Sequence, residues 1–266
     1  MWIRKLPVVP TIITLLCVVI MFGLGIWQLE RKAEKDIRLA QIEERKANRP
    51  YQLDELIAQT LPSNTNSREA LGLDIQDYPV TVTGVAQTEQ LFFIDNKIVD
   101  GKTGYQIVVP VLDRNNKLLL ANLGWLRGSG LRGDLPTLSQ DFYQHYAQQE
   151  REFSGVVNFP SDNKMISETN QNFGQFPVLL QQIDIAQMEQ HLQASSLFYE
   201  GKVYSFVLNL ADDPKTEFVR NWQAVVMSPE KHLGYAAQWF GLGIAALTIY
   251  LLSLMKLFQT KNKKEN

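Results

Sequence analysis

Cysteine and histidine are scarce in this chain of 266 residues, which has one cysteine and three histidines. The single Cys17 excludes internal disulfides, CxxC motifs, copper delivery by paired thiols and the cysteine signature of covalently attached haem. The three histidines, His145, His191 and His232, are far apart in the sequence. This spacing argues against a zinc site built from protein ligands alone.

Net charge is also nearly absent, because 26 Lys and Arg stand against 28 Asp and Glu, a formal charge of −2. A near-neutral chain has no basic field to attract nucleic acid, so no nucleic-acid partner is expected. The length fits one large domain or two small ones.

Two long uncharged runs, residues 6–26 and 233–255, stand near the two ends of the chain. About 20 apolar residues suffice to cross a hydrocarbon core, so both runs are predicted to be transmembrane helices. For the first run, a cleaved signal peptide is the alternative, since Arg4 and Lys5 provide a charged start. The run is longer than a signal core and "GLGIWQLERK" lacks a small-x-small cleavage site, which favours an uncleaved anchor.

Lysine and arginine near the ends of the runs indicate the orientation. Arg4 and Lys5 precede the first run, and four lysines follow the second, whereas acids are interleaved with the cations on the inner flanks. A segment of about 200 residues between the runs translocates largely regardless of its charge. We therefore expect two cytoplasmic termini and a large domain on the outer side, which is the periplasm in a bacterial inner membrane.

Period-two patterns between the runs predict strands, bounded by turns such as the one at residues 113–116. The expected strands are 78–86, 90–95, 104–112, 116–126, 151–160, 202–211 and 218–229. Helix is expected at 181–195, a loop-rich stretch with one short helix at 51–77, and a polar segment at 128–149. Seven or so strands with one or two helices predict a membrane-anchored α+β protein, in which an antiparallel sheet or small barrel lies between two membrane helices.

The predicted organisation has five parts. They are a short cytoplasmic N-terminus with the first transmembrane helix (1–29), a charged helical extension (30–50), the extracytoplasmic β-rich domain (51–231), the second transmembrane helix (232–255) and a basic cytoplasmic tail (256–266).

No catalytic constellation stands out in the predicted domain, so no enzyme activity is expected. His145 and His191 have polar neighbours in the sequence and are interpreted as surface histidines. Asp212 and Asp213, with Glu217, are interpreted as a solvated turn in preference to a cation site.

Amphipathic side chains gather at the outer ends of the two spans: Trp27 and Gln28 close the first, and Tyr235 and Trp239 lie in the opening turns of the second. On a helical wheel His232 shares a face with Tyr235 and Trp239. The opposite face carries small residues, which predicts that this face packs on the first span: Gly234, Ala237, Gly241, Ala245 and Thr248.

Residue His232 has two interpretations. It is an interfacial anchor, or it is an axial ligand of haem iron, to which an imidazole on an aromatic face is well suited. In the second case Tyr235 and Trp239 pack the macrocycle, and Lys231 or the cations after Trp27 meet the propionates.

Five motifs in order resemble the surfeit locus protein 1 family: "FGLGIWQLERKAEK", "YPVTVTG", "LFFIDNK…GKTGYQIVVPVL", "LLLANLGWLRG" and "HLGYAAQWF". The resemblance extends from Phe22 to about Tyr250. Members of that family are assembly factors for haem–copper cytochrome c oxidase, with two membrane helices and a large domain between them, and are not known as enzymes. Bacterial members are implicated in binding haem a and in its insertion into oxidase subunit I.

The resemblance implies a haem a site with His232 as ligand to the iron and with Tyr235, Trp239, Trp27 and Gln28 around it. It also implies subunit I and the haem A synthesis machinery as partners, and a second copy of the chain is a further candidate. The alternative is a membrane-tethered scaffold that binds oxidase subunits without haem.

The chain departs from the family pattern at two places, which indicates a divergent member. Gly124 matches a glycine in the family's "NRGW"-like motif, but Leu123 replaces its arginine. Phe173 and Phe176 stand where the family has a tryptophan.

Overall fold

The structure, a computed structural model, describes residues 7–46, 49–60, 75–129, 134–146, 149–161, 163, 165–166, 170–195, 202–222 and 227–265. The chain divides into two compact units. One is formed by the two terminal segments, residues 1–41 and 223–266, and the other by residues 42–222.

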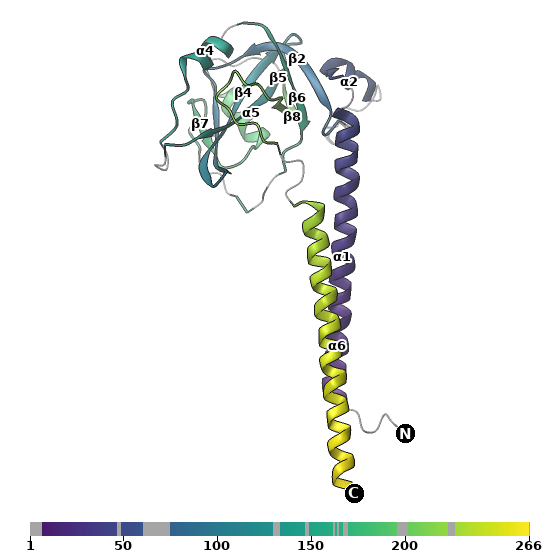
Figure 1. Ribbon diagram of the computed structural model, residues 1–266. Helices are drawn as coiled ribbons and strands as arrows, with labels where there is room; N and C mark the ends of the chain where they lie inside the picture. Colours follow the sequence, from purple (N-terminus) through teal and green to yellow (C-terminus); the bar gives the residue numbers. More distant parts are fainter. Residues whose placement is uncertain are drawn as a thin grey trace. The chain divides into compact units, whose positions relative to one another are not determined.

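The terminal unit contains two long helices, α1 (Val8–Lys46) and α6 (Pro229–Glu265), drawn in purple and in green to yellow (Figure 1). Both are long and apolar enough to cross a membrane, over Val8–Arg45 and Pro229–Thr260, yet only 6% of each apolar window is buried. An equally apolar helix in a soluble protein would be covered by the core, so this exposure fits surrounding lipid. The apolar run and the charged extension predicted after it lie in the single helix α1.

A closed five-stranded barrel is the centre of the second unit (Figure 1). Its strands follow one another in the order β2 (Pro79–Ala86), β6 (Arg151–Asn158), β8 (Val203–Leu210), β5 (Leu118–Arg127) and β4 (Lys102–Asp113), and β4 pairs back onto β2. All of these pairs are antiparallel except β5–β8. The predicted fold class is confirmed, as a barrel, and closure leaves these strands without free edges.

Further elements surround the barrel. The short strand β1 (Tyr51–Gln52) runs parallel to β2, while β3 (Phe92–Val99) pairs with β4 and carries β7 (Val178–Leu180) on its other edge. The helices that the structure describes in this unit are α2 (Leu53–Thr60), α4 (Gln140–Tyr146) and α5 (Ile185–Gln193).

Two hydrophobic clusters cover the two faces of β5, which explains why eight of its positions in a row are buried. Leu119, Ala121 and Leu123 belong to the cluster that fills the barrel. Leu118 and Leu120 belong to a second cluster, together with residues of β3, β7, β8 and helix α5. A strand buried on both faces loses the polar–apolar alternation that half-buried strands show.

Three local predictions differ from the structure. Helix α4 lies in the segment predicted as polar, because two aromatic side chains four residues apart, Phe142 and Tyr146, bury one face of an otherwise polar turn. The strand predicted at 218–229 is reduced to a single bridge at Val219, while residues 223–226 lie outside the described part of the chain. Strands β1 and β7 are too short for the period-two pattern to reveal.

Candidate functional site

Helices α1 and α6 contact each other along a regular seam. The less exposed positions of α1 alternate at spacings of three and four: Thr11, Thr14, Val18, Met21, Gly25 and Gln28. Those of α6 include His232, Ala236, Trp239, Gly243, Ala246 and Tyr250, at the same spacings. This period of 3.5 residues is that of helices packed side by side as in a coiled coil.

Aromatic rings of one helix fill spaces left by glycines of the other. A Cβ atom at Gly25 would lie 2.5 Å from a ring carbon of Phe240, and one at Gly243 would lie 2.7 Å from the ring of Phe22. The two rings meet edge to face, with centroids 5.4 Å apart. Each glycine therefore leaves space for one aromatic ring of the other helix. This fit fixes the register of the two helices and their rotation about their axes.

The face of α6 predicted to pack on α1 is the wrong one. Gly234 and Gly241, from the small-residue row, have open space where a Cβ would stand, and Ala237, Ala245 and Thr248 are exposed. The seam instead uses the face of His232 and Gly243. A row of small residues permits close approach, but here the rings and a polar pair select the other face.

One polar pair stands at each end of the seam. Nδ1 of His232 lies 2.7 Å from Oε1 of Gln28. At the other end, the hydroxyl of Thr11 donates to the carbonyl of Pro7 at 2.8 Å. The phenol of Tyr250 contacts the same hydroxyl, so the phenol is the donor in that second hydrogen bond. At 1.5 Å per residue the two pairs are about 26 Å apart along the helices, close to the thickness of a hydrocarbon core.

The histidine of this pair is well enclosed, since His232 is 8% exposed and the neighbouring Ala236 is 1% exposed. The amide oxygen of Gln28 faces Nδ1 and can only accept, so this contact is a hydrogen bond when the neutral imidazole carries its proton on Nδ1. Nε2 then keeps its lone pair, and it has no hydrogen bond within the described part of the chain.

The other predicted site residues do not all join the pair. Trp27 and Tyr235 are 46% and 42% exposed, and Trp239 is half-buried. Arg31 lies over the ring of Trp27, 5.8 Å from its centroid. Over the described residues, no hydrogen bond or ring contact joins Trp27, Tyr235 or Trp239 to His232. The structure thus brings together Gln28 and His232, and leaves Trp27 and Tyr235 on more open surface.

The seam can be tested by a disulfide. A Cβ at Gly243 would lie 3.6 Å from Cβ of Met21, within the range for a disulfide. A chain with Met21→Cys and Gly243→Cys is expected to crosslink on mild oxidation, on a background of Cys17→Ser and of Phe22→Ala, which removes the ring 2.7 Å from the new Cβ. Adding Gly25→Leu should weaken pairing by about 2 kcal/mol, or about 30-fold, because the larger side chain meets the Phe240 ring.

The matched controls use the open positions. Gly23→Leu should leave the crosslink unchanged, because nothing lies within 4 Å of a Cβ there, and a cysteine at 241 in place of 243 should not crosslink. Efficient crosslinking through position 241 would show that the predicted small-residue face is the true seam.

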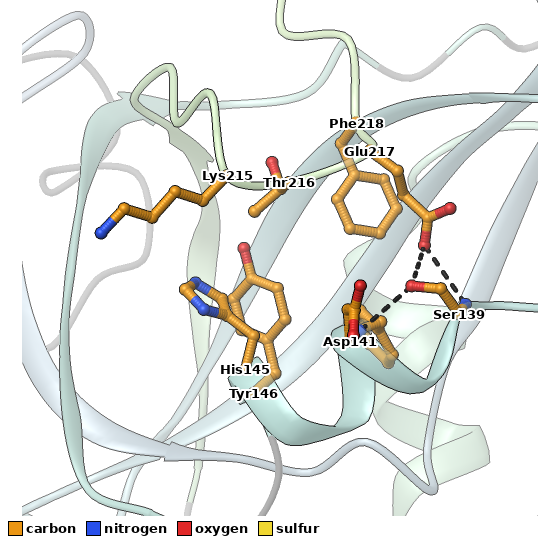
Figure 2. Close-up of a pocket in the computed structure, with 9 residues that line it drawn as sticks. Ser139, Asp141, His145, Tyr146, Lys215, Thr216, Glu217 and Phe218 are labelled. Atoms are coloured by element: carbon orange, nitrogen blue, oxygen red, sulfur yellow. Dashed lines mark hydrogen bonds between the residues drawn. The ribbon is translucent and has the colours of Figure 1, made fainter.

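A pocket of about 280 Å³ lies in the barrel unit, between α4 and the segment 215–218 (Figure 2). Serine, histidine and carboxylate side chains all line it, but they are not assembled for nucleophilic catalysis. Ser139 caps α4: its hydroxyl accepts from the amide of Phe142 at 3.1 Å and donates to Glu217 at 3.0 Å. Figure 2 shows His145 on the side of the pocket opposite Ser139.

The histidine side of this pocket is cationic. Burial and the nearby Arg151 lower the pKa of His145, and Asp213, 3.5 Å away, opposes this shift. Burial raises the pKa of Tyr146, whose phenol accepts from Arg220 at 3.0 Å. His145 is half-buried, so its interpretation as a surface histidine holds only in part.

The interpretation of His191 as a surface residue is wrong, because its side chain is fully buried. It lies against Phe173, with ring centroids 4.6 Å apart, and belongs to the same helix face as Met188 and Leu192. Neither ring nitrogen has a hydrogen-bond partner in the part of the chain that the structure describes. Burial lowers the pKa of His191, so the ring is held neutral.

This burial predicts a pH dependence of stability. The unfolded chain binds a proton at His191 more readily than the folded one, so the free energy of unfolding should fall as the pH drops from 6.5 towards the lowered pKa. His191→Phe should remove this contribution, measured as urea midpoints at pH 5 and pH 7. His145→Gln is the control for the other shifted histidine, and an unchanged pH dependence in His191→Phe would contradict the assignment.

Leu123, the departure from the family motif, and Gly124, which matches it, lie at a bulge in β5. The register with β4 shifts there, and Gly124 has a φ of 126°. The Leu123 side chain is fully buried in the barrel, and Nε of Arg220 donates to its carbonyl at 2.6 Å. A guanidinium thus reaches this point from another segment, which the sequence pattern does not indicate. Trp125 is 7% exposed and donates to the carbonyl of Lys97 at 3.0 Å.

Comparison with known proteins agrees with the resemblance. A model of the SURF1 family matches residues 15–244, which include the barrel, the His232–Gln28 pair and most of the seam. A SURF1-like protein of Rickettsia felis is 25% identical over 244 residues, covering 91% of this chain and 95% of its own length. The family match covers the domain and reaches into both apolar helices. The chain therefore belongs to the SURF1 family.

Proposed function

We propose that this chain is an assembly factor for haem–copper cytochrome c oxidase that holds haem a through His232 and assists its insertion into subunit I. Membership of the family supports the role in oxidase assembly. The observation that carries the haem proposal is the hydrogen bond from Nδ1 of His232 to Gln28, because it leaves Nε2 as a lone-pair donor.

The residues at the head of α6 fit a haem. A single imidazole is a sufficient protein ligand on one side of haem iron, and the exposed rings of Tyr235 and Trp27 offer apolar surface beside it. Haem a, when bound, supplies the iron that accepts the imidazole nitrogen. The chain's own part is to hold the imidazole, exclude water from it and offer the macrocycle an aromatic surface.

The lysine and arginine side chains proposed to bind the haem propionates differ in whether they already form an ion pair. Arg31 and Lys32 form ion pairs with Glu34 and Asp36, at 2.6 Å and 2.5 Å. Lys231 is exposed and has no ion pair among the described residues. We therefore assign Lys231, next to the proposed ligand, as the first cation to meet a propionate, while the exposed pairs would have to exchange partners.

The proposed location is a bacterial inner membrane, with both termini cytoplasmic and the barrel in the periplasm. The distribution of lysine and arginine and the length of the central segment support this orientation. It puts the His232–Gln28 pair near the periplasmic surface, and makes subunit I and the haem A synthesis machinery the expected partners.

The test is an absorption spectrum of the full chain purified in detergent from cells that make haem A. We expect a Soret band and an extracted haem of the a type, and no such haem from a matched strain without haem A synthesis. A wild-type protein that purifies without haem a, and does not take it up when titrated, would refute the haem part of the proposal.

A membrane-tethered scaffold that binds oxidase subunits without haem is the second candidate. Large apolar side chains exposed on the barrel unit favour it: Ile98 at 67%, Val219 at 43% and Tyr143 at 43%. It predicts that His232→Ala leaves oxidase activity intact while polar substitutions at these three positions reduce it. Gly124 and Trp125 are unsuitable for this comparison, because their changes would disturb the fold.

A further inference from the structure

The amide of Gln28, on α1, meets the imidazole of His232, on α6. Gln28 lies on the seam, three residues after Gly25, and the Phe240 ring packed at Gly25 fixes how far α6 is rotated. Its Oε1 is 2.7 Å from Nδ1 of His232, while Trp27 and Leu29, its neighbours in the chain, are exposed. The contact is thus determined by the packing of the helices, not by a flexible side chain meeting another at the surface.

An uncharged acceptor at this point decides which nitrogen of the ring carries the proton. In water a neutral imidazole exchanges freely between its two forms, but a buried N–H needs a partner and a buried acceptor oxygen needs a donor. With the ring 8% exposed, the form protonated on Nδ1 satisfies both groups at once. The other form would set the lone pair of Nδ1 against the amide oxygen, leaving two acceptors face to face.

We infer that Gln28 is a positioning residue, which holds the His232 ring in the form protonated on Nδ1 and in one orientation, so that Nε2 is presented as the ligand nitrogen. This inference rests on the proposed function for its consequence in haem binding, but the protonation of the ring is a property of the chain alone. Groups that orient a ligating histidine are typically worth 10–100-fold in metal affinity.

The first test needs no haem. The full chain is labelled with ¹⁵N-histidine and its spectrum recorded in detergent micelles, where only three imidazoles contribute. The resonances of His232 are identified by their loss in His232→Asn. We expect a protonated Nδ1 and an unprotonated Nε2 in the wild type, and a shift towards the form protonated on Nε2 in Gln28→Leu. A wild-type His232 protonated on Nε2 would overturn the inference.

The second test measures affinity by titration of the haem-free chain with haem a, followed at the Soret band. Gln28→Leu should weaken binding by about 10–100-fold, while Gln28→Glu, which keeps an acceptor, should keep the Nδ1 proton and restore most of the affinity. Gln238→Leu is the matched control, because Gln238 is a glutamine on α6 with an exposed side chain. Equal affinities of wild type and Gln28→Leu would overturn the positioning role.

The two tests separate the possible failures. If Gln28→Leu separated the two helices, the disulfide between positions 21 and 243 would no longer form. Gln28→Glu keeps the helices packed and still tests whether a hydrogen-bond acceptor is needed at this position. If the ¹⁵N spectrum is as expected and the wild type binds no haem a, the proposed function is wrong while the assignment of the ring proton stands. If haem a binds and the ring is protonated on Nε2, the proposed function stands and the role of Gln28 is wrong.

Discussion

A chain with His232→Gly is expected to lose haem a and to regain it when imidazole is added to the buffer. The glycine removes the proposed ligand and leaves a space beside Gln28 that a free imidazole can fill. One nitrogen of that imidazole would donate to Gln28 and the other would be free for iron, as in the native ring. The loss should be at least about 100-fold in affinity, more than removal of the supporting amide causes.

The measurement is the Soret absorbance of the purified chain during titration with haem a, with and without imidazole. His145→Gly is a matched control, since that histidine lies in the barrel unit beside the pocket of Figure 2. Unchanged haem binding in His232→Gly would show that another residue is the ligand to the iron. Binding lost and not rescued would argue that His232 supports the site through the packing of the helices.

Gly124→Ala is expected to have the largest effect on the stability of the barrel unit. Its φ of 126° is a conformation that L-residues avoid, which costs on the order of 1–3 kcal/mol. In addition, a Cβ would lie 2.9 Å from both Cβ of Phe218 and the carbonyl oxygen of Val219, where no flexible side-chain end can move away. Overpacking of this kind costs about 1–3 kcal/mol more. A total of about 4 kcal/mol is a large part of the stability of a typical domain.

The matched control is Gly101→Ala, at the turn between β3 and β4. This glycine also has a positive φ, 72°, but nothing lies within 4 Å of its Cβ position. Only the conformational cost of about 1–2 kcal/mol should appear. Urea unfolding followed by tryptophan fluorescence would compare the two variants, and equal midpoints would show that the contacts of Gly124 with residues 218–219 contribute nothing.

The helices and strands that correspond to a repeating pattern or a long uncharged run could be predicted from the sequence. Uncharged runs mark α1 and α6, and alternation marks β2 and β6. Strands β4 and β8 are buried on both faces and are marked instead by their β-branched and aromatic residues. The closure of the barrel could not be predicted, since the β2–β4 pairing joins residues 84–86 to 111–113 through backbone atoms.

Single residues were predicted less well where neighbours in space differ from neighbours in sequence. His191 follows Glu189 and Gln190 in the chain, but on helix α5 it lies close to Met188 and Leu192 and is buried with them. A helical wheel of α6 alone does not include α1. It could not show that the Gln28 amide needs a hydrogen-bond partner or that the Phe22 ring needs space. The choice of face depends on both helices, and it reverses the one that small residues suggest.

The order in which the chain is synthesised determines when the His232–Gln28 pair can form. Gln28 precedes all strands of the barrel in the chain, and His232 follows them. The barrel has the same requirement, because β5 needs β8, and Leu118 pairs with Val203. A chain that stops before β8 therefore has no closed barrel, and one that stops before His232 has no enclosed histidine. Under the proposed function, a chain that stops before His232 would lack the ligand to the iron and would not hold haem a.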